Sequence, residues 1–186
     1  IISIDGFECA GHPGEDDIPG LILIPAAADK VRIPMLASGG FGDGRGLVAA
    51  LSLGAEGINM GTRFCATKEA PIHDNVKQAY VDNDERGSFL IFRSLKNTAR
   101  VGKSAVSEEV VRRLAQPDAT FADVAELVNG KAGRELLETG DLTKGVFWAG
   151  MVQGLIHDIP SCQELIDRII AEAEAVLDQR LTGFRA

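Results

Sequence analysis

Cysteine is scarce in this sequence of 186 residues, and its three copies lie far apart. Cys9, Cys65 and Cys162 have neither the spacing of a metal site nor the even number typical of a disulfide framework. The sequence therefore predicts no bound metal. It also indicates a chain that stays reduced, as expected in the cytoplasm.

Long apolar runs and an excess of positive charge are missing too. No apolar stretch approaches the roughly 20 residues that span a bilayer, and no basic segment followed by an apolar one opens the chain. The formal net charge of −8 disfavours nucleic acid as a partner. The hydrophobic content of 45% is ordinary for a globular protein with a buried core. We therefore expect neither a membrane nor a nucleic acid as partner.

Three short apolar runs each end in a glycine turn and are followed by a helix-like segment. The runs are residues 1–4, 33–37 and 57–60. A helix is predicted over 21–31, and a second one follows Asp43, a plausible N-cap, and ends before Gly54, a plausible C′ glycine. Short apolar strands that alternate with helices predict parallel strands covered by helices. Two α/β architectures fit this pattern: a doubly wound sheet and a (β/α)8 barrel.

The number of strands indicates only part of a barrel. A complete (β/α)8 barrel needs about 250 residues, and the pattern here supplies three strands. The chain also opens inside a β-branched run, without an initiating Met. We therefore expect a truncated chain that holds about strands six to eight, with strands one to five upstream.

The remaining residues predict two further regions. From residue 65 to 145, helical patterns over 69–83, 107–116 and 121–128 and a short strand at 89–93 predict a smaller, mainly helical domain. Helical patterns return over 146–156 and 164–181, which predicts helices that pack back on the barrel. The expected division is thus barrel units at 1–64, a cap domain at 65–145 and C-terminal helices at 146–186.

Two glycine turns, Ser38-Gly39-Gly40 and Gly61-Thr62, follow consecutive strands. Glycine lets backbone N–H groups approach a ligand closely, and a helix amino terminus adds partial positive charge. In barrels a phosphate site is often built from the loops after the last two strands. The turns therefore predict a phosphate site with the Thr62 hydroxyl as a donor, the alternative being simple tight turns. Arg63 and Lys68 are candidates for neutralising the phosphate charge.

His12 is the candidate catalytic residue. It lies in Gly11-His12-Pro13-Gly14, just past a strand end and at the same edge as the phosphate turns. Histidine exchanges protons near neutral pH, which suits proton abstraction. A surface-loop histidine is the alternative. The other candidates have structural interpretations: His73 and His157 near helix ends, Cys9 as a packed thiol, Trp148 as a buried anchor, and residues 15–17 as a solvated acidic edge.

Five motifs along the chain carry a resemblance to a known family. They are residues 5–17 (DGFECAGHPGEDD), 37–40 (ASGG), 59–64 (NMGTRF), 97–100 (NTAR) and 149–156 (AGMVQGLI). In this order they resemble the nitronate monooxygenases, formerly called 2-nitropropane dioxygenases. The similarity covers nearly the whole chain. It is closest to the bacterial branch that includes an NADH:quinone reductase.

The resemblance implies an FMN-binding (β/α)8 barrel with a smaller second domain. It implies that His12 is the active-site histidine. Its flavin-lining positions are Asp5, Ala10 and Gly11, and its ribityl- and phosphate-binding positions are Ser38, Gly39, Gly40, Met60, Gly61 and Thr62. The implied reaction is the oxidation of alkyl nitronates with O2 to a carbonyl compound and nitrite.

Three alternatives stay open. Much of the family reads Ala-Gly-Gly-His where this chain has Cys9-Ala10-Gly11-His12, a departure that favours an NAD(P)H:quinone reductase using FMN. The other two are a non-flavin barrel enzyme with a phosphate-bearing substrate and a non-catalytic fragment. The expected partners are a small-molecule substrate (a nitronate or quinone, with NAD(P)H in the reductase) and a second copy in a homodimer.

Overall fold

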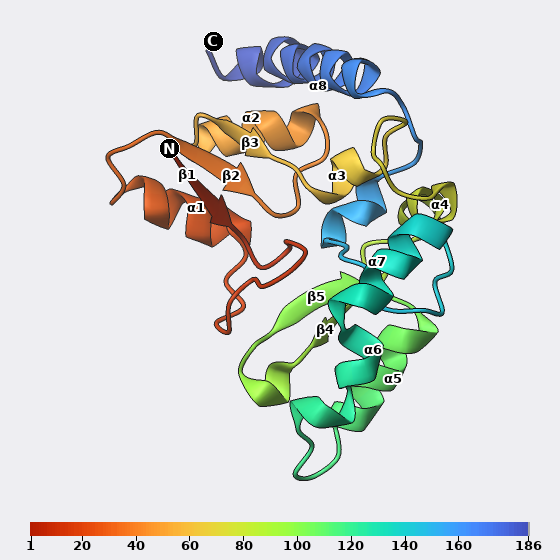
Figure 1. Cartoon of the computed structure of the whole chain (residues 1–186). Coiled ribbons are helices and arrows are strands. Elements are labelled where there is room, and N and C mark those ends of the chain that lie inside the picture. The colour runs from red at the N-terminus through yellow and green to blue at the C-terminus, as the bar shows by residue number, and fades with distance from the viewer. Residues whose placement is uncertain (186) are drawn as a thin grey trace.

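The computed structural model describes residues 1–185 and contains a parallel three-stranded sheet (Figure 1). Its strands are β1 (Ile2–Asp5), β2 (Met35–Ser38) and β3 (Gly57–Asn59), in the order β1-β2-β3. The register places Asp5 beside Ser38 and Ser38 beside Asn59, so the three strands end at the same level. The predicted α/β class and parallel pairing are confirmed.

Helices α1 (Gly20–Ala28) and α2 (Gly44–Ser52) cover one face of this sheet. Ile4, Ala37 and Ile58 lie in register across the strands and pack with Ile24 of α1 and Ala50 of α2. Because side chains alternate along a strand, the polar ends of the strands lie on the opposite face. The sheet thus has one helix-covered face and one polar face.

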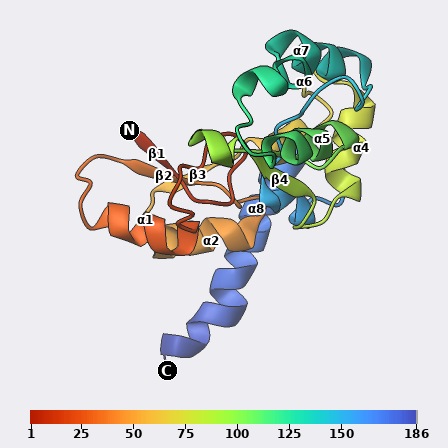
Figure 2. The ribbon, with the colours of Figure 1, turned by 90° about the horizontal axis from the view of Figure 1, so that it is seen from below.

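Helix α2 has the predicted ends, and a long helix packs against it. The Asp43 side chain accepts a hydrogen bond from Gly46 N at 2.8 Å, and Gly54 adopts a φ of 94° just after the helix. Helix α8 (Cys162–Val176) lies across α2 and extends beyond it, followed by the π-helical turn η4 (Leu177–Leu181) and η5 (Thr182–Arg185) (Figures 1 and 2). The predicted helix over 164–181 therefore begins two residues earlier.

The middle of the chain forms a second group of elements around an antiparallel hairpin. The hairpin strands β4 (Ser88–Ile91) and β5 (Ala99–Gly102) flank η1 (Arg93–Leu95) and pack against helix α5 (Ala105–Leu114). The other elements are α3 (Thr62–Cys65), α4 (Asp74–Asp82), η2 (Phe121–Asp123), α6 (Ala125–Val128) and α7 (Gly130–Thr139). The expected strand ends at Ile91 because Phe92 turns into the left-handed region, with a φ of 63°. Strand β5 and helix α7 were not expected.

The expected helix over 146–156 is wrong. Residues 146–150 are extended and mostly buried, and only η3 (Met151–Leu155) is helical, as a 3-10 turn. Tertiary partners use the backbone groups that a helix would need: Gly102 N donates to Phe147 O at 2.7 Å, and Met151 N donates to Glu8 O at 2.9 Å. This segment therefore joins the hairpin to the loop after β1.

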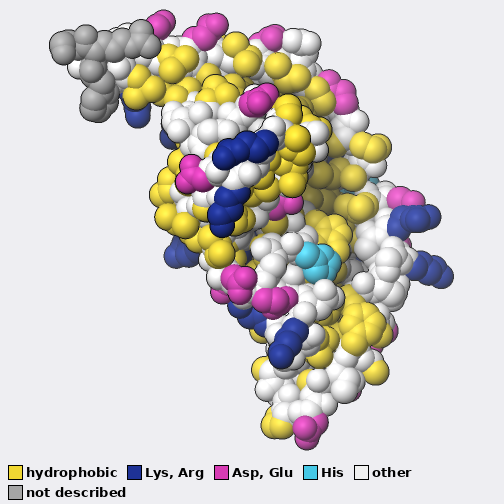
Figure 3. Space-filling view, turned by 90° about the vertical axis from the view of Figure 1, so that its left-hand side faces the viewer, with side chains coloured by type: hydrophobic (Ala, Val, Ile, Leu, Met, Phe, Trp, Pro, Cys, Tyr) yellow, Lys and Arg dark blue, Asp and Glu magenta, His cyan; other side chains and the backbone are white. Residues whose placement is uncertain are grey.

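The face that carries β1 and α1 exposes large apolar side chains (Figure 3). They are Ile1, Ile2, Leu21, Ile22 and Ile33. β1 is also an edge strand, with β2 on one side only. Within the described residues, no helix is long and apolar enough to cross a membrane.

Candidate functional site

The carboxyl ends of the three parallel strands open into one cavity of about 180 Å³. Its walls come from the strand ends, from both glycine turns and from the segment around Gly150. The predicted residues that line it are Asp5, Ala10, Ser38, Gly39, Gly40, Met60, Gly61 and Thr62. Because parallel strands present their carboxyl ends at one edge, residues more than 50 positions apart meet here.

Glycine gives this cavity its shape. Gly39 and Gly40 have φ values of 83° and 85°, in the region that favours glycine. A Cβ on Gly39 would lie 2.9 Å from Gly6 O, and one on Gly150 would lie 2.9 Å from Glu8 O. A Cβ on Gly61 would meet no other atom within 4 Å. Bare backbone therefore forms the cavity wall, a surface that an anionic phosphate group can approach closely.

The Thr62 hydroxyl joins two of these segments. Thr62 is buried, and its Oγ1 accepts a hydrogen bond from Gly150 N at 3.0 Å. A hydroxyl that accepts this bond still has its own hydrogen to donate. Thr62 can thus hold the 150 segment in place and donate to a ligand in the cavity.

The amino termini of α1 and α2 do not serve the cavity as expected. At α2, the Glu172 carboxylate accepts from Gly44 N at 2.8 Å, in addition to the Asp43 cap. At α1, the Glu8 carboxylate accepts from Gly20 N at 3.0 and 3.2 Å. Because carboxylates of the protein already neutralise part of the positive charge at these helix ends, the backbone N–H groups of the glycine turns are the better candidates for donors to an anion.

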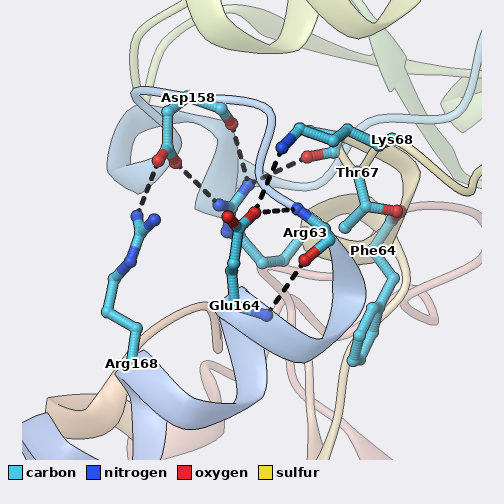
Figure 4. Close-up of polar contacts among 9 residues, drawn as sticks. Arg63, Phe64, Thr67, Lys68, Asp158, Glu164 and Arg168 are labelled. Atoms are coloured by element: carbon cyan, nitrogen blue, oxygen red, sulfur yellow. Dashed lines mark hydrogen bonds and ion pairs between the residues drawn. The ribbon is translucent and has the colours of Figure 1, made fainter.

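Arg63 and Lys68 do not reach the cavity. Arg63 is buried and pairs through Nη2 with Asp158 Oδ1 at 2.9 Å, and Lys68 pairs with Glu164 at 3.2 Å (Figure 4). Burial lowers the pKa of Arg63, although Asp158 opposes this effect. Within residues 1–185, no Lys or Arg lines the cavity. The prediction that these two cations neutralise a phosphate is therefore wrong.

His12 and Gly11 directly follow the cavity residue Ala10 but do not line the cavity itself. His12 is exposed, and its ring centroid lies 6.1 Å from that of Trp148. Trp148 was expected to be buried, yet it is 46% exposed. The chain is extended here, so Phe147 and Ala149 point inward and Trp148 points outward. The two rings form an exposed pair next to the cavity.

The remaining candidate residues have structural roles outside ligand binding or are packed in the cavity wall. His73 Nδ1 accepts from Asn75 N at 3.1 Å at the start of α4, and His157 lies in the loop before α8. Cys9 is packed in the cavity wall, as expected. Burial raises the pKa of its thiol to about 11, and the Asp5 carboxylate adds to this effect. Within residues 1–185, no group of three or more His, Cys, Asp or Glu side chains is arranged to hold a metal ion.

Sequence reasoning missed several residues of the cavity wall: Glu8, Phe41, Asn59, Gly150 and Val152. Asn59 had a usable signal, because it ends its strand in register with Ser38. Gly150 and Val152 had none in their local pattern, since their place depends on distant parts of the chain: Gly150 N bonds to Thr62 Oγ1, 88 positions earlier, and a Cβ on Gly150 would lie 2.9 Å from Glu8 O.

Comparison with known proteins agrees with this geometry. A sequence model described as "Nitronate monooxygenase" matches residues 1–172. This chain belongs to the nitronate monooxygenase family. A "probable nitronate monooxygenase" of Staphylococcus haemolyticus is 29% identical and matches 95% of this chain and 51% of its own length.

Other relatives have different names. One relative from Rhodococcus jostii is 32% identical, and the match covers 95% of this chain and 60% of the relative. Its name is (3aS,4S,5R,7aS)-5-hydroxy-7a-methyl-1-oxo-octahydro-1H-indene-4-carboxyl-CoA dehydrogenase. The solved structure of FabK from Thermotoga maritima superposes with a TM-score of 0.88 at 30% identity, covering 98% of this chain and 56% of that one. The chain thus spans between half and two thirds of the length of these relatives.

Proposed function

We propose that this chain forms the phosphate-binding and histidine-bearing part of an FMN-dependent oxidoreductase built on a (β/α)8 barrel. The observation that carries the proposal is the glycine-walled cavity at the strand ends, in which eight of the residues predicted to hold FMN come together. The open sheet, with helices on one face and polar strand ends on the other, suits three adjacent units of such a barrel.

The residues of the cavity fit FMN at its phosphate end. The positive φ values at Gly39 and Gly40 and the open space beside Gly61 leave room for a phosphate against the backbone. The Thr62 hydroxyl has a hydrogen to donate, and Ser38 and Asn59 add polar groups. When bound, FMN would supply the electron transfer; the protein would position it and tune it.

His12 would act as the acid–base group of the site. An imidazole two residues beyond the cavity-wall residue Ala10 is placed to accept a proton from a nitroalkane carbon or to stabilise a bound nitronate anion. The preferred reaction is the oxidation of an alkyl nitronate with O2 to a carbonyl compound and nitrite, which family membership supports. An NAD(P)H:quinone reductase is the second candidate, favoured by Cys9 in place of the commoner alanine. In that reaction His12 would donate its proton to a quinone oxygen.

The proposed enzyme also has an expected domain arrangement and cellular location. The cap domain at 65–145 would close one side of the site, residues 146–186 would pack back on the barrel, and the enzyme would act in the cytoplasm, where its three free thiols stay reduced.

The test is steady-state turnover of the complete FMN-loaded enzyme with propyl nitronate, set against NADH or NADPH plus a quinone. Nitrite release with the nitronate supports the first reaction, and nicotinamide oxidation that depends on the quinone supports the second. His12→Gln should lower either turnover number about 10²- to 10⁴-fold with flavin content unchanged. Flavin that neither donor reduces would contradict both assignments.

A further inference from the structure

The loop that carries His12 has little regular structure of its own. Gly11 and Gly14 have φ values of 80° and 89°, and Asp17 has a φ of 53°. His12, Glu15 and Asp16 are exposed. An exposed loop of this kind samples many conformations unless other parts of the protein fix it. What fixes it therefore decides where the imidazole lies.

The first attachment lies just before His12. Gly11 N donates to Arg100 O at 3.1 Å, and Arg100 N donates to Gly11 O at 2.6 Å, so the loop pairs with β5 like a short extra strand. The buried Arg100 guanidinium donates through Nη2 to Phe7 O at 3.0 Å and lies 4.5 Å from the Phe7 ring centroid. These contacts hold both ends of Phe7–Gly11, the stretch that contains the cavity residues Cys9 and Ala10.

The second attachment lies three residues after His12. The Glu15 carboxylate accepts from Thr98 N at 2.7 Å and from Thr98 Oγ1 at 2.6 Å. Thr98 is 1% exposed, so one partner of this pair is rigidly placed. Both bonds stabilise the ionised carboxylate and lower the pKa of Glu15. A further pair, Arg93 with Asp17 at 2.6 Å, holds the end of the loop.

We propose that Glu15 and Thr98 are positioning residues for His12: together with the Gly11–Arg100 pair, they hold the imidazole beside Trp148 at the edge of the cavity. Neither residue touches the reacting atoms. Any effect of Glu15 and Thr98 on turnover rests on the proposed role of His12. Their effect on the position of the imidazole ring does not depend on that role. The hairpin β4–β5 thereby gains a function beyond packing, because it fixes the geometry of the active-site loop.

A flavin-free measurement tests the position of the ring. The complete enzyme, freed of FMN and carrying 5-fluorotryptophan, reports the position of the ring through 19F NMR. Trp148→Phe identifies the Trp148 resonance, and His12→Gln should shift it, because the two ring centroids lie 6.1 Å apart. Glu15→Ala and Thr98→Val should move this resonance at least halfway toward its position in His12→Gln. Thr98→Ser, which keeps the hydroxyl, should restore the parent position, and the neighbouring Asp16→Ala should leave the resonance unchanged.

Turnover of the complete FMN-loaded enzyme then tests the consequence. Glu15→Ala and Thr98→Val should lower kcat about tenfold, with KM within twofold and flavin content unchanged, while Asp16→Ala matches the parent enzyme. If Glu15→Ala behaves like Asp16→Ala in both measurements, the positioning role is overturned. If neither the parent enzyme nor any variant binds FMN, the proposed function fails, and the 19F resonance of Trp148 in the FMN-free enzyme still decides whether Glu15 and Thr98 hold the ring.

Discussion

At the scale of single residues, Gly61 is the residue that bears most directly on ligand binding. Its backbone angles, φ −93° and ψ −73°, are open to any L-residue, and a Cβ there would meet no protein atom. Nothing in the folded chain therefore requires glycine at this position. In the proposed FMN site, its small size leaves space for the ligand.

The substitution Gly61→Ala should weaken FMN binding without destabilising the fold. The added methyl group would occupy space that the phosphate needs, so we expect at least a tenfold rise in the Kd for FMN, or about 1.4 kcal/mol. Fluorescence titration of FMN with the complete enzyme measures this change. Gly130→Ala is the matched control, since a Cβ at Gly130 also meets no atom within 4 Å. Equal Kd values for the two variants would contradict the role of Gly61.

Cys9 should be unreactive at neutral pH although it lies in the cavity wall. With its pKa raised to about 11 by burial, roughly one thiol in a thousand is ionised at pH 8, and the thiolate is the reactive form. We expect iodoacetamide to leave Cys9 unmodified at pH 8 and to label it faster as the pH approaches 11. Peptide mass spectrometry locates the label, and unfolded protein, in which all three cysteines react, is the control. Labelling of Cys9 at pH 8 at the unfolded rate would exclude the packed thiol.

At the scale of elements, the contact between α2 and α8 depends on the absence of a side chain. A Cβ on Gly44 would lie 2.5 Å from both Ile169 O and Ala173 N, so the two helices approach as closely as backbone allows. The Glu172 carboxylate, from the same face of α8, accepts the Gly44 N–H. This contact fixes α8 on the outside of the sheet.

Gly44→Ala should therefore separate the two helices. Overpacking of this kind costs about 1–3 kcal/mol, which we expect as a lower free energy of unfolding in urea. Gly133→Ala is the control, because a Cβ there comes no closer than 3.6 Å to Val146 O and lies inside α7, where alanine gains about 0.5–1 kcal/mol over glycine. An unfolding free energy for Gly44→Ala at or above that of the parent chain would show that α8 does not pack as described.

Local pattern predicted several strands and helices but missed the locally capped helix α7 and the segments set by tertiary contacts. The strands ending at Asp5, Ser38 and Asn59 could be predicted from apolar runs and glycine turns, and α2 from Asp43 and Gly54. The segment around Phe147 has an apolar, Gly- and Ala-rich pattern that suits a helix equally well. Its backbone is extended because Gly102 and Glu8 bind it from distant parts of the chain.

The difference between local pattern and tertiary contacts also explains which parts of the candidate site could be predicted. Sequence pattern could place the two glycine turns at one edge, because parallel strands bring their ends together. It could not show that Glu172 and Glu8 occupy the helix ends, or that Arg63 faces Asp158 instead of the cavity. Those outcomes depend on pairs more than ten residues apart, which no local motif records.

At the scale of the whole molecule, the sheet is open, and the surface over β1 and α1 is apolar. β1 and β3 each have one strand neighbour, and Leu21 and Ile22 of α1 are 68% and 59% exposed. In the proposed (β/α)8 barrel, five further strands would complete the sheet, and the unit next to β1 would cover the β1–α1 surface. Exposed apolar patches of this kind mark surfaces that other parts of a structure bury.

The chain by itself should accordingly bind the hydrophobic dye ANS, and Leu21→Glu should reduce the dye fluorescence by removing part of the patch. Leu155→Glu, which alters a 43% exposed leucine in η3, is the control and should have a smaller effect. The complete barrel should bind little dye. Strong dye binding by the complete barrel would mean that the β1–α1 face is not covered by further units.

The proposal that the cavity at the strand ends holds FMN can be tested by the absorbance spectrum of the complete barrel after FMN addition and desalting. We expect flavin bands at about one FMN per chain, and their loss in Gly61→Val. A complete, folded barrel without flavin bands would exclude an FMN site here and leave the glycine turns as tight turns only.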